Sequence, residues 1–113
     1  MKRLLRSFRY AFHGLAYAWH HEANFKLHCV IALLVFVAAF FKHVSVFGMA
    51  LLALAISGVL GLELVNTVIE RLMDALSARV HPLARDMKDM MAGAVLVASL
   101  GAVGVGVVVF VLL

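Results

Sequence analysis

Carboxylate side chains are scarce in this sequence, and three of the six recur along one predicted helical face. Glu63, Glu70 and Asp74 are separated by 7 and 4 residues. At about 100° per residue, these positions fall within roughly 40° of one another around a helix. Asn66 and Thr67 flank the same face, and we call these five residues the polar ladder. Carboxylate and amide groups in such a row are suited to binding a divalent cation and to moving a proton.

Glu63 begins the polar ladder directly after 44–62, a run of 19 residues without a charge. An ionisable side chain at the boundary of the hydrocarbon is energetically expensive and usually marks function. The alternative is a helix end that simply emerges into water. That alternative accounts well for Asp74 and partly for Glu70, but it accounts poorly for Glu63.

A basic segment follows the ladder and leads into the last apolar run. Pro82 can open a helix there, because the N–H that proline lacks would be unpaired in the first turn anyway. A helix start that carries Arg and Lys attracts anions, and phosphate above all. A cytoplasmic anchor of positive charge would account for Arg79 and Arg85, but less well for Lys88 beside Asp89. The residues of interest in this segment are Arg79, His81, Arg85, Lys88 and Asp89.

Carboxylates, amides and a basic segment together indicate nucleotide chemistry through a divalent cation. Mg²⁺ is usually held by one or two carboxylates and by phosphate oxygens. Phosphoryl transfer then needs positioning, charge neutralisation and a base for the proton of the acceptor. A glutamate at the membrane boundary could serve a hydroxyl that belongs to a lipid. The sequence contains neither a Walker A motif nor a protein-kinase signature.

Composition indicates that membrane helices position these groups. Of the 113 residues, 65% are hydrophobic and 14% are charged, and the mean hydropathy is +1.07. A soluble chain of this length could not bury so much apolar surface. At about 1.5 Å per residue, the apolar runs suffice for a hydrocarbon core about 30 Å thick. We predict an all-α membrane protein of one domain, with transmembrane helices at 25–42, 44–74 (including a cytoplasmic extension) and 83–113.

Residues 1–22 predict an amphipathic helix on the membrane surface rather than a fourth span. Leu4, Phe8, Leu15 and Trp19 recur at helical spacing, and basic residues occupy another face. Nine of the ten Lys and Arg residues lie in this helix, at the start of the first span or around the connection between the second and third spans. Positive residues stay on the cytoplasmic side. We therefore expect a multi-pass protein of the cell membrane with a cytoplasmic N-terminus.

Several strings of the sequence resemble the motifs of one known family. LELVNTVIERLMD (62–74) and HPLARDMKDMMAGAV (81–95) resemble the signature region of the small prokaryotic diacylglycerol kinases and undecaprenol kinases. EANFKLH (22–28) and SFRYAFHGL (7–15) resemble further motifs of that family. The resemblance implies a homotrimer of three-span subunits with a surface helix. It also implies active sites at the cytoplasmic interface between subunits, where the γ-phosphoryl group of Mg-ATP passes to a lipid alcohol.

The same resemblance implies roles for individual residues. Glu63 corresponds to the catalytic base, and Asn66 would support it. Glu22 and Glu70 correspond to the ligands of Mg²⁺, so the folded trimer must bring them close, whereas Asp74 would be structural or supporting. The residues that would contact ATP are Arg3, Tyr10, Glu22, Glu70, Arg79, Val80, His81, Lys88 and Asp89. The residues that would contact the lipid are Asn24, Phe25, Lys26, His28, Glu63 and Ala92.

The sequence leaves the lipid and two non-enzymatic alternatives open. The pattern Asn24-Phe25-x-x-His28 and the string HPLAR are closer to the undecaprenol kinase branch, although diacylglycerol presents the same kind of hydroxyl. A small transporter subunit or an assembly factor is the main alternative, but a transporter would place polar residues near the middle of the membrane. The net charge of +4 would permit an adaptor that recruits nucleic acid. Membrane topology already explains the basic residues, so we expect no nucleic-acid partner.

Overall fold

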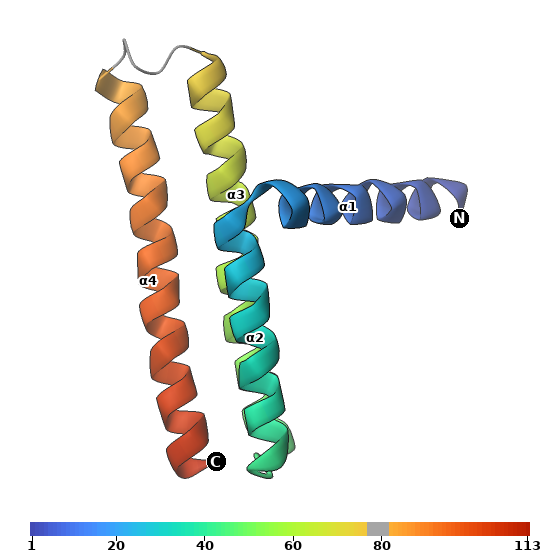
Figure 1. Ribbon diagram of the computed structural model, residues 1–113, viewed down its shortest axis with the longest axis vertical. Coiled ribbons are helices and arrows are strands. Elements are labelled where there is room, and N and C mark those ends of the chain that lie inside the picture. Colours follow the sequence, from blue (N-terminus) through green and yellow to red (C-terminus); the bar gives the residue numbers. More distant parts are fainter. Residues whose placement is uncertain (77–81) are drawn as a thin grey trace.

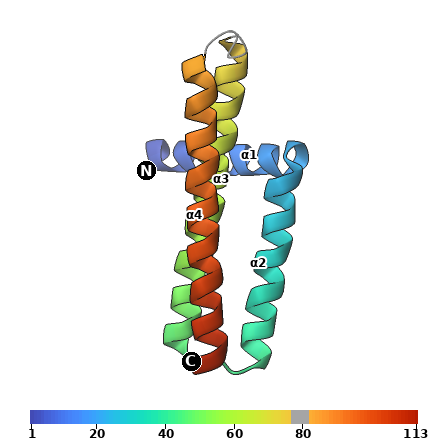
Figure 2. The same ribbon diagram turned by 90° about the vertical axis from the view of Figure 1, so that its left-hand side faces the viewer.

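The computed structural model describes residues 1–76 and 82–113, which form four helices. They are α1 (Lys2–His21), α2 (Ala23–Phe41), α3 (Val46–Ala75) and α4 (Pro82–Leu112). The helices α2, α3 and α4 run alongside one another, and α1 is directed away from them (Figures 1 and 2). The predicted all-α class is confirmed. The prediction of three helices long and apolar enough to cross a membrane is also confirmed, and these are α2, α3 and α4.

A tight turn joins α2 to α3 and is closed by the backbone. The N–H of Val44 donates to the carbonyl of Ala39 at 3.1 Å, and the intervening His43 has φ = 56°. This combination is typical of a helix that ends in a left-handed residue. Ser45 then caps α3, because its Oγ accepts a hydrogen bond from the N–H of Gly48 at 3.0 Å. The turn therefore folds α3 back alongside α2.

The helix α3 packs more extensively against α4 than against α2. The buried core consists of Ala39, Leu52 and Val109, one residue from each long helix. Gly48 permits a close approach near the turn, since a Cβ atom there would lie 2.6 Å from Val44 Cγ1 and 3.2 Å from Val109 Cγ1. A glycine at this position is what lets the beginning of α3 meet the end of α4.

The helices α1 and α2 meet at Glu22, which we call the elbow. Its backbone is extended, with φ = −121° and ψ = 105°. Its N–H nevertheless donates to Ala18 at 2.8 Å, and its carbonyl accepts from the N–H of Lys26 at 3.1 Å. Ala18 and Phe25 are buried on the two sides of the elbow. One non-helical residue thus redirects the chain and fixes where the Glu22 side chain starts.

The C-terminal end of α3 and the N-terminal end of α4 extend past the level of α1. Both views show the yellow end of α3 and the orange beginning of α4 beyond the blue helix (Figures 1 and 2). Glu70, Asp74 and Lys88 belong to these projecting ends. The charged part of the polar ladder is therefore separated from the apolar length of the helices.

Most large apolar side chains of the long helices face outward. Val46 is 88% exposed and Val111 is 73% exposed. A soluble monomer rarely exposes so much contiguous apolar surface. Lipid or further copies of the chain must cover this surface.

Replacing Gly48 by alanine should destabilise the packing of α3 on α4. The added Cβ would displace Val44 and Val109, and overpacking of this kind costs about 1–3 kcal/mol. Gly101 is the matched control, because a Cβ atom there meets nothing within 4 Å and alanine favours a helix over glycine by up to ~1 kcal/mol. The free energy of unfolding, measured by titration with a denaturing detergent, should fall for Gly48→Ala and not for Gly101→Ala. Equal values for the two variants would contradict this packing.

Candidate active site

Glu63 is a buried carboxylate at the start of the polar ladder. The residue is 9% exposed, and it lies where α3 leaves its uncharged run. His28 of α2 faces it, with Nδ1 2.6 Å from Glu63 Oε2. The His28 side chain is 34% exposed. The two side chains thus bridge α2 and α3 at the level where the hydrocarbon is expected to end.

Three polar atoms around Glu63 are buried with unmet hydrogen-bonding capacity. Within the described residues, His28 Nδ1, Glu63 Oε2 and Asn66 Oδ1 have no partner of hydrogen-bond geometry. The 2.6 Å contact between His28 and Glu63 is a close approach rather than an aligned hydrogen bond. Asn66 follows Glu63 by one helical turn. Buried polar atoms without partners are rare and often mark a ligand, a water or a catalytic role. This buried cluster can therefore receive a further polar group.

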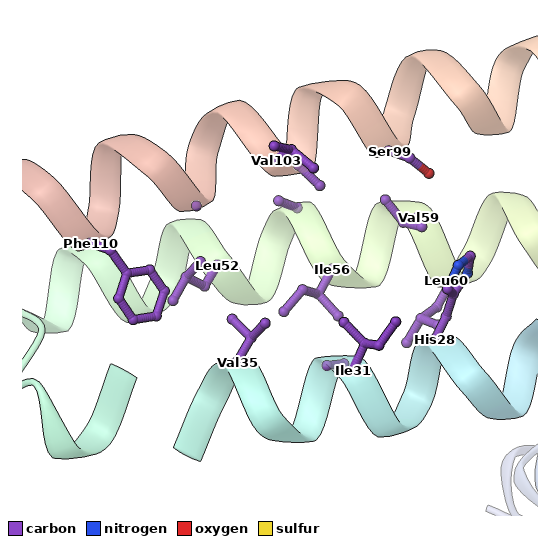
Figure 3. A pocket seen from close by; sticks show the side chains of 14 residues that line it. His28, Ile31, Val35, Leu52, Ile56, Val59, Leu60, Ser99, Val103 and Phe110 are labelled. Atoms are coloured by element: carbon purple, nitrogen blue, oxygen red, sulfur yellow. The ribbon is translucent and has the colours of Figure 1, made fainter. Parts of the chain in front are cut away.

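An apolar groove begins at His28 and runs along the helices away from the buried cluster (Figure 3). It lies between α2, α3 and α4 and has a volume of about 300 Å³. Its lining residues are apolar except for His28 and Ser99. Phe110 and Leu52 lie at the end of the groove away from His28 (Figure 3). The groove has the chemistry to take a hydrocarbon chain whose polar end stops beside Glu63.

A second polar cluster fastens the elbow to α3. Arg71 donates from Nε to Glu22 Oε1 at 3.0 Å and makes a further hydrogen bond from Nη2 to the same oxygen. Its Nη1 donates to the Tyr17 hydroxyl at 3.2 Å. Tyr17 stacks on His21, with ring centroids 4.0 Å apart. A cavity of about 550 Å³ between α1 and α3 is lined by Tyr10, Glu22 and Arg71, among others.

An ion pair joins the projecting ends of α3 and α4. Lys88 Nζ donates to Asp74 Oδ1 at 2.9 Å. The Asp74 side chain is 66% exposed, so solvent screens the pair and its contribution to stability is small. Its consequence is geometric, because it holds the Lys88 ammonium at the same end of the molecule as the polar ladder.

The family of the chain follows from its sequence matches. The family model described as prokaryotic diacylglycerol kinase matches residues 9–110. The chain belongs to this family. A diacylglycerol kinase of Synechocystis sp. is 42% identical over 104 residues, which cover 91% of this chain and 59% of that protein. The undecaprenol kinase of Bacillus subtilis is 34% identical over 110 residues, which cover 97% of this chain and 89% of that protein. The diacylglycerol kinase of Escherichia coli strain K12 is 34% identical over 101 residues, 89% of this chain and 83% of that protein.

Membership in the prokaryotic diacylglycerol kinase family confirms the resemblance seen in the sequence motifs. It places the chain among lipid kinases and does not favour a transporter subunit or an assembly factor. A kinase family implies ATP as the phosphate donor. Together with the three apolar helices, the family indicates a multi-pass membrane protein.

Some of the residues predicted as the base, its support or the lipid contacts meet in the buried cluster, and the others lie elsewhere. The buried cluster unites Glu63, Asn66 and His28 from α2 and α3. Of the predicted lipid contacts, His28 lines the apolar groove. The others do not line it: Phe25 is buried within the chain, and the exposed ones are Asn24, Lys26 and Ala92.

The residues predicted to contact ATP are distributed over separate places. Glu22 is paired with Arg71 at the elbow, where Tyr10 lines the neighbouring cavity. Lys88 is paired with Asp74 at the projecting ends. The exposed members of the set are Arg3, Tyr10, Glu70 and Asp89. Three predicted residues lie outside the described part of the chain, namely Arg79, Val80 and His81.

Carboxylate side chains that could bind Mg²⁺ are present at the elbow and on α3. The described residues contain no group of three or more His, Cys, Asp or Glu side chains that could hold a metal ion. Because Mg²⁺ usually takes one or two carboxylates with phosphate oxygens, the chemistry of Glu22 and Glu70 fits this metal. Both hydrogen bonds from Arg71 to Glu22 end on Oε1. The predicted approach of Glu22 to Glu70 in a trimer stays a prediction.

Sequence reasoning misses Arg71 and Tyr17. In the sequence, Arg71 is one more cytoplasmic positive charge, and its partner Glu22 lies 49 residues away. No local spacing signals a contact of that separation. The one available hint is that Arg71 directly follows Glu70 in the polar ladder.

Replacing Glu63 by methionine should remove lipid kinase activity without destabilising the fold. An apolar side chain in place of a buried carboxyl group with unmet hydrogen bonds is often neutral or stabilising, and His28 keeps access to solvent. The free energy of unfolding in a denaturing-detergent titration should change by no more than about 1 kcal/mol. Val109→Ala is the comparison variant that should lose stability, because Val109 is 0% exposed. A loss of about 3 kcal/mol or more for Glu63→Met would show that Glu63 holds the fold together instead.

Proposed function

We propose that this chain phosphorylates a membrane lipid alcohol, undecaprenol or diacylglycerol, with Mg-ATP at the cytoplasmic face of the cell membrane. The products are undecaprenyl phosphate or phosphatidic acid. The observation that carries the proposal is the buried Glu63, paired with His28 at the head of the apolar groove. His28 belongs to the pattern that favours undecaprenol, whereas the relatives include kinases named for each lipid.

The apolar groove and the buried cluster suit the two ends of such a substrate. The hydrocarbon chain would lie between α2 and α4, against the apolar side chains of α3 (Figure 3). The hydroxyl would then stop beside Glu63, where buried oxygen and nitrogen atoms have unmet hydrogen-bonding capacity. Few water molecules reach this depth, so little solvent competes with the carboxylate as the acceptor of the hydroxyl proton.

Glu63 acts as the general base of the transfer. It accepts the proton of the lipid hydroxyl while that oxygen forms a bond to the γ-phosphorus of ATP. The bond between the γ-phosphorus and the bridging oxygen breaks, and ADP leaves with the electron pair. Asn66, one turn along α3, supports the hydroxyl or the carboxylate through its side-chain amide. Glu22 and Glu70 would hold Mg²⁺, which would neutralise phosphate charge when bound.

The nucleotide lies against the charged ends of the molecule. Lys88, oriented by Asp74 at 2.9 Å, contacts the phosphates as a positive point charge. Asp89 and the segment Arg79–His81 lie near it in the sequence and complete the nucleotide contacts, together with Arg3 and Tyr10 of α1. Tyr10 lines the cavity beside the elbow, which supports a contact from this side.

The proposed membrane orientation follows from charge and from the shape of the chain. We propose that α1 lies in the cytoplasmic interface with the N-terminus inside, because nine of ten Lys and Arg residues fall on this side. The projecting ends of α3 and α4 then enter the cytosol, where ATP is available (Figure 1). The large outward-facing apolar surface supports a homotrimer in lipid, whose subunits together would complete each active site.

Purified full-length protein in mixed micelles should transfer labelled phosphate from Mg-ATP to a lipid alcohol. Undecaprenol and diacylglycerol are tested side by side, and an alkane of matched length without a hydroxyl is the control. We expect transfer to at least one alcohol, because the groove begins at His28, which contacts Glu63. Undecaprenol should be preferred, because the pattern Asn24-Phe25-x-x-His28 is closer to that branch of the family. Transfer to neither alcohol by an intact, folded assembly would contradict the proposed function.

Two carboxylate variants should separate the base from the metal ligand. Glu63→Gln should lower kcat about 10²–10⁴-fold while ATP binding persists, since only proton transfer is lost. Glu70→Gln should instead raise the Mg²⁺ concentration needed for half-maximal activity. Asp86→Asn, at an exposed position of α4, is the matched control and should retain normal rates. Near-normal turnover of Glu63→Gln would mean that the hydroxyl loses its proton to another group.

A further inference from the structure

We propose that Arg71 is a positioning residue that holds the Glu22 carboxylate in the orientation that binds the metal–nucleotide complex. The inference rests on the proposed function, in which Glu22 is a ligand of Mg²⁺. Among the described residues, Arg71 belongs neither to the buried cluster nor to the lining of the apolar groove.

The contact between Arg71 and Glu22 uses one side of the carboxylate. Two N–H groups of the guanidinium, on Nε and Nη2, both donate to Oε1. In the described part of the chain, no hydrogen bond reaches Oε2. A planar guanidinium that fixes one oxygen also fixes the plane of the carboxylate and leaves the other oxygen for a cation. Outer partners of metal ligands commonly have this role.

The Glu22 side chain could instead cap the N-terminus of α2, and its contact with Arg71 prevents this. It occupies the N-cap position of α2, where a carboxylate is attracted by the unpaired N–H groups of the first turn. Its side chain nevertheless makes no capping hydrogen bond. The carboxylate is directed to Arg71 on α3 instead. Without the guanidinium, capping of α2 would turn the carboxylate away from α3.

Arg71 is itself held from a second side by α1. Its Nη1 donates to the Tyr17 hydroxyl at 3.2 Å, and its guanidinium carbon lies 5.5 Å from the centroid of the Tyr17 ring. Tyr17 is fixed in turn by stacking on His21. These contacts tie α1, the elbow and α3 together on the turn that also carries Glu70. Arg71 therefore sets how Glu22 is presented relative to the second predicted ligand.

The test measures metal binding directly, with Mn²⁺ as the probe. Full-length protein in micelles is titrated with Mn²⁺ in the presence of a non-hydrolysable ATP analogue, and bound metal is followed by electron paramagnetic resonance. Arg71→Met should weaken Mn²⁺ binding about 10–100-fold, while KM for the lipid alcohol stays within about twofold of the wild-type value. Arg6→Met, at an exposed position of α1, is the matched control and should bind Mn²⁺ normally.

Two further variants distinguish positioning from a merely structural role. If Arg71 acts through Glu22, the double variant Glu22→Gln/Arg71→Met should bind Mn²⁺ no more weakly than Glu22→Gln alone. Additive losses in the double variant would overturn the inference. Arg71→Lys keeps the positive charge but loses the planar guanidinium with its two parallel N–H donors. The Mn²⁺ affinity of this variant should therefore lie between those of the wild type and Arg71→Met. If Arg71→Met does not fold, an unchanged affinity of Arg71→Lys overturns the inference.

Different results would overturn the positioning role of Arg71 and the proposed kinase function. Mn²⁺ affinity of folded Arg71→Met within about twofold of the wild type would overturn the role of Arg71 while leaving the kinase proposal intact. A wild-type protein that binds Mn²⁺ with the nucleotide analogue but phosphorylates no lipid alcohol would remove the proposed function. In that case the affinity of Arg71→Met still decides whether Arg71 positions Glu22.

Discussion

An ionisable side chain at the edge of a bilayer costs free energy. In this protein, the His28 imidazole is the group that approaches the Glu63 carboxylate. The imidazole lies 2.6 Å from the carboxylate and reaches partly into solvent. It does not satisfy the site, because buried polar atoms of His28, Glu63 and Asn66 keep unmet hydrogen-bonding capacity. Binding of a hydroxyl-bearing lipid would supply the missing partner, so the energetic cost in the free protein and the affinity for substrate have one origin.

The packing of the surrounding helices brings the Glu63 carboxylate to His28, the residue at which the apolar groove begins. The turn at His43 and Ser45 folds α3 back beside α2, which places His28 opposite Glu63. Gly48 brings α3 onto α4 close to this turn, and the groove lies between the three helices. The elbow at Glu22 then carries α1 away from the spans (Figure 1). The same elbow places the Glu22 carboxylate against Arg71 of α3.

The helices and their apolar character could be predicted from local sequence, because hydropathy and helical periodicity are properties of neighbouring residues. The uncharged run 44–62 and the polar ladder that follows it pointed to Glu63 in the same way. The partners of these residues could not be predicted. The pairs His28–Glu63 and Glu22–Arg71 join α2 or the elbow to α3, and such pairs depend on how helices pack. Likewise, motif resemblance predicted that His28 contacts the lipid but did not reveal that it lies against Glu63.

The most direct test of the central claim is the structure of the full assembly in a lipid bilayer with a lipid alcohol and a non-hydrolysable ATP analogue. We expect the hydroxyl oxygen within about 2.6–3.2 Å of a Glu63 carboxylate oxygen, with the hydrocarbon chain in the groove between α2 and α4. A structure in which Glu63 faces open water, or in which the hydroxyl lies elsewhere, would contradict it.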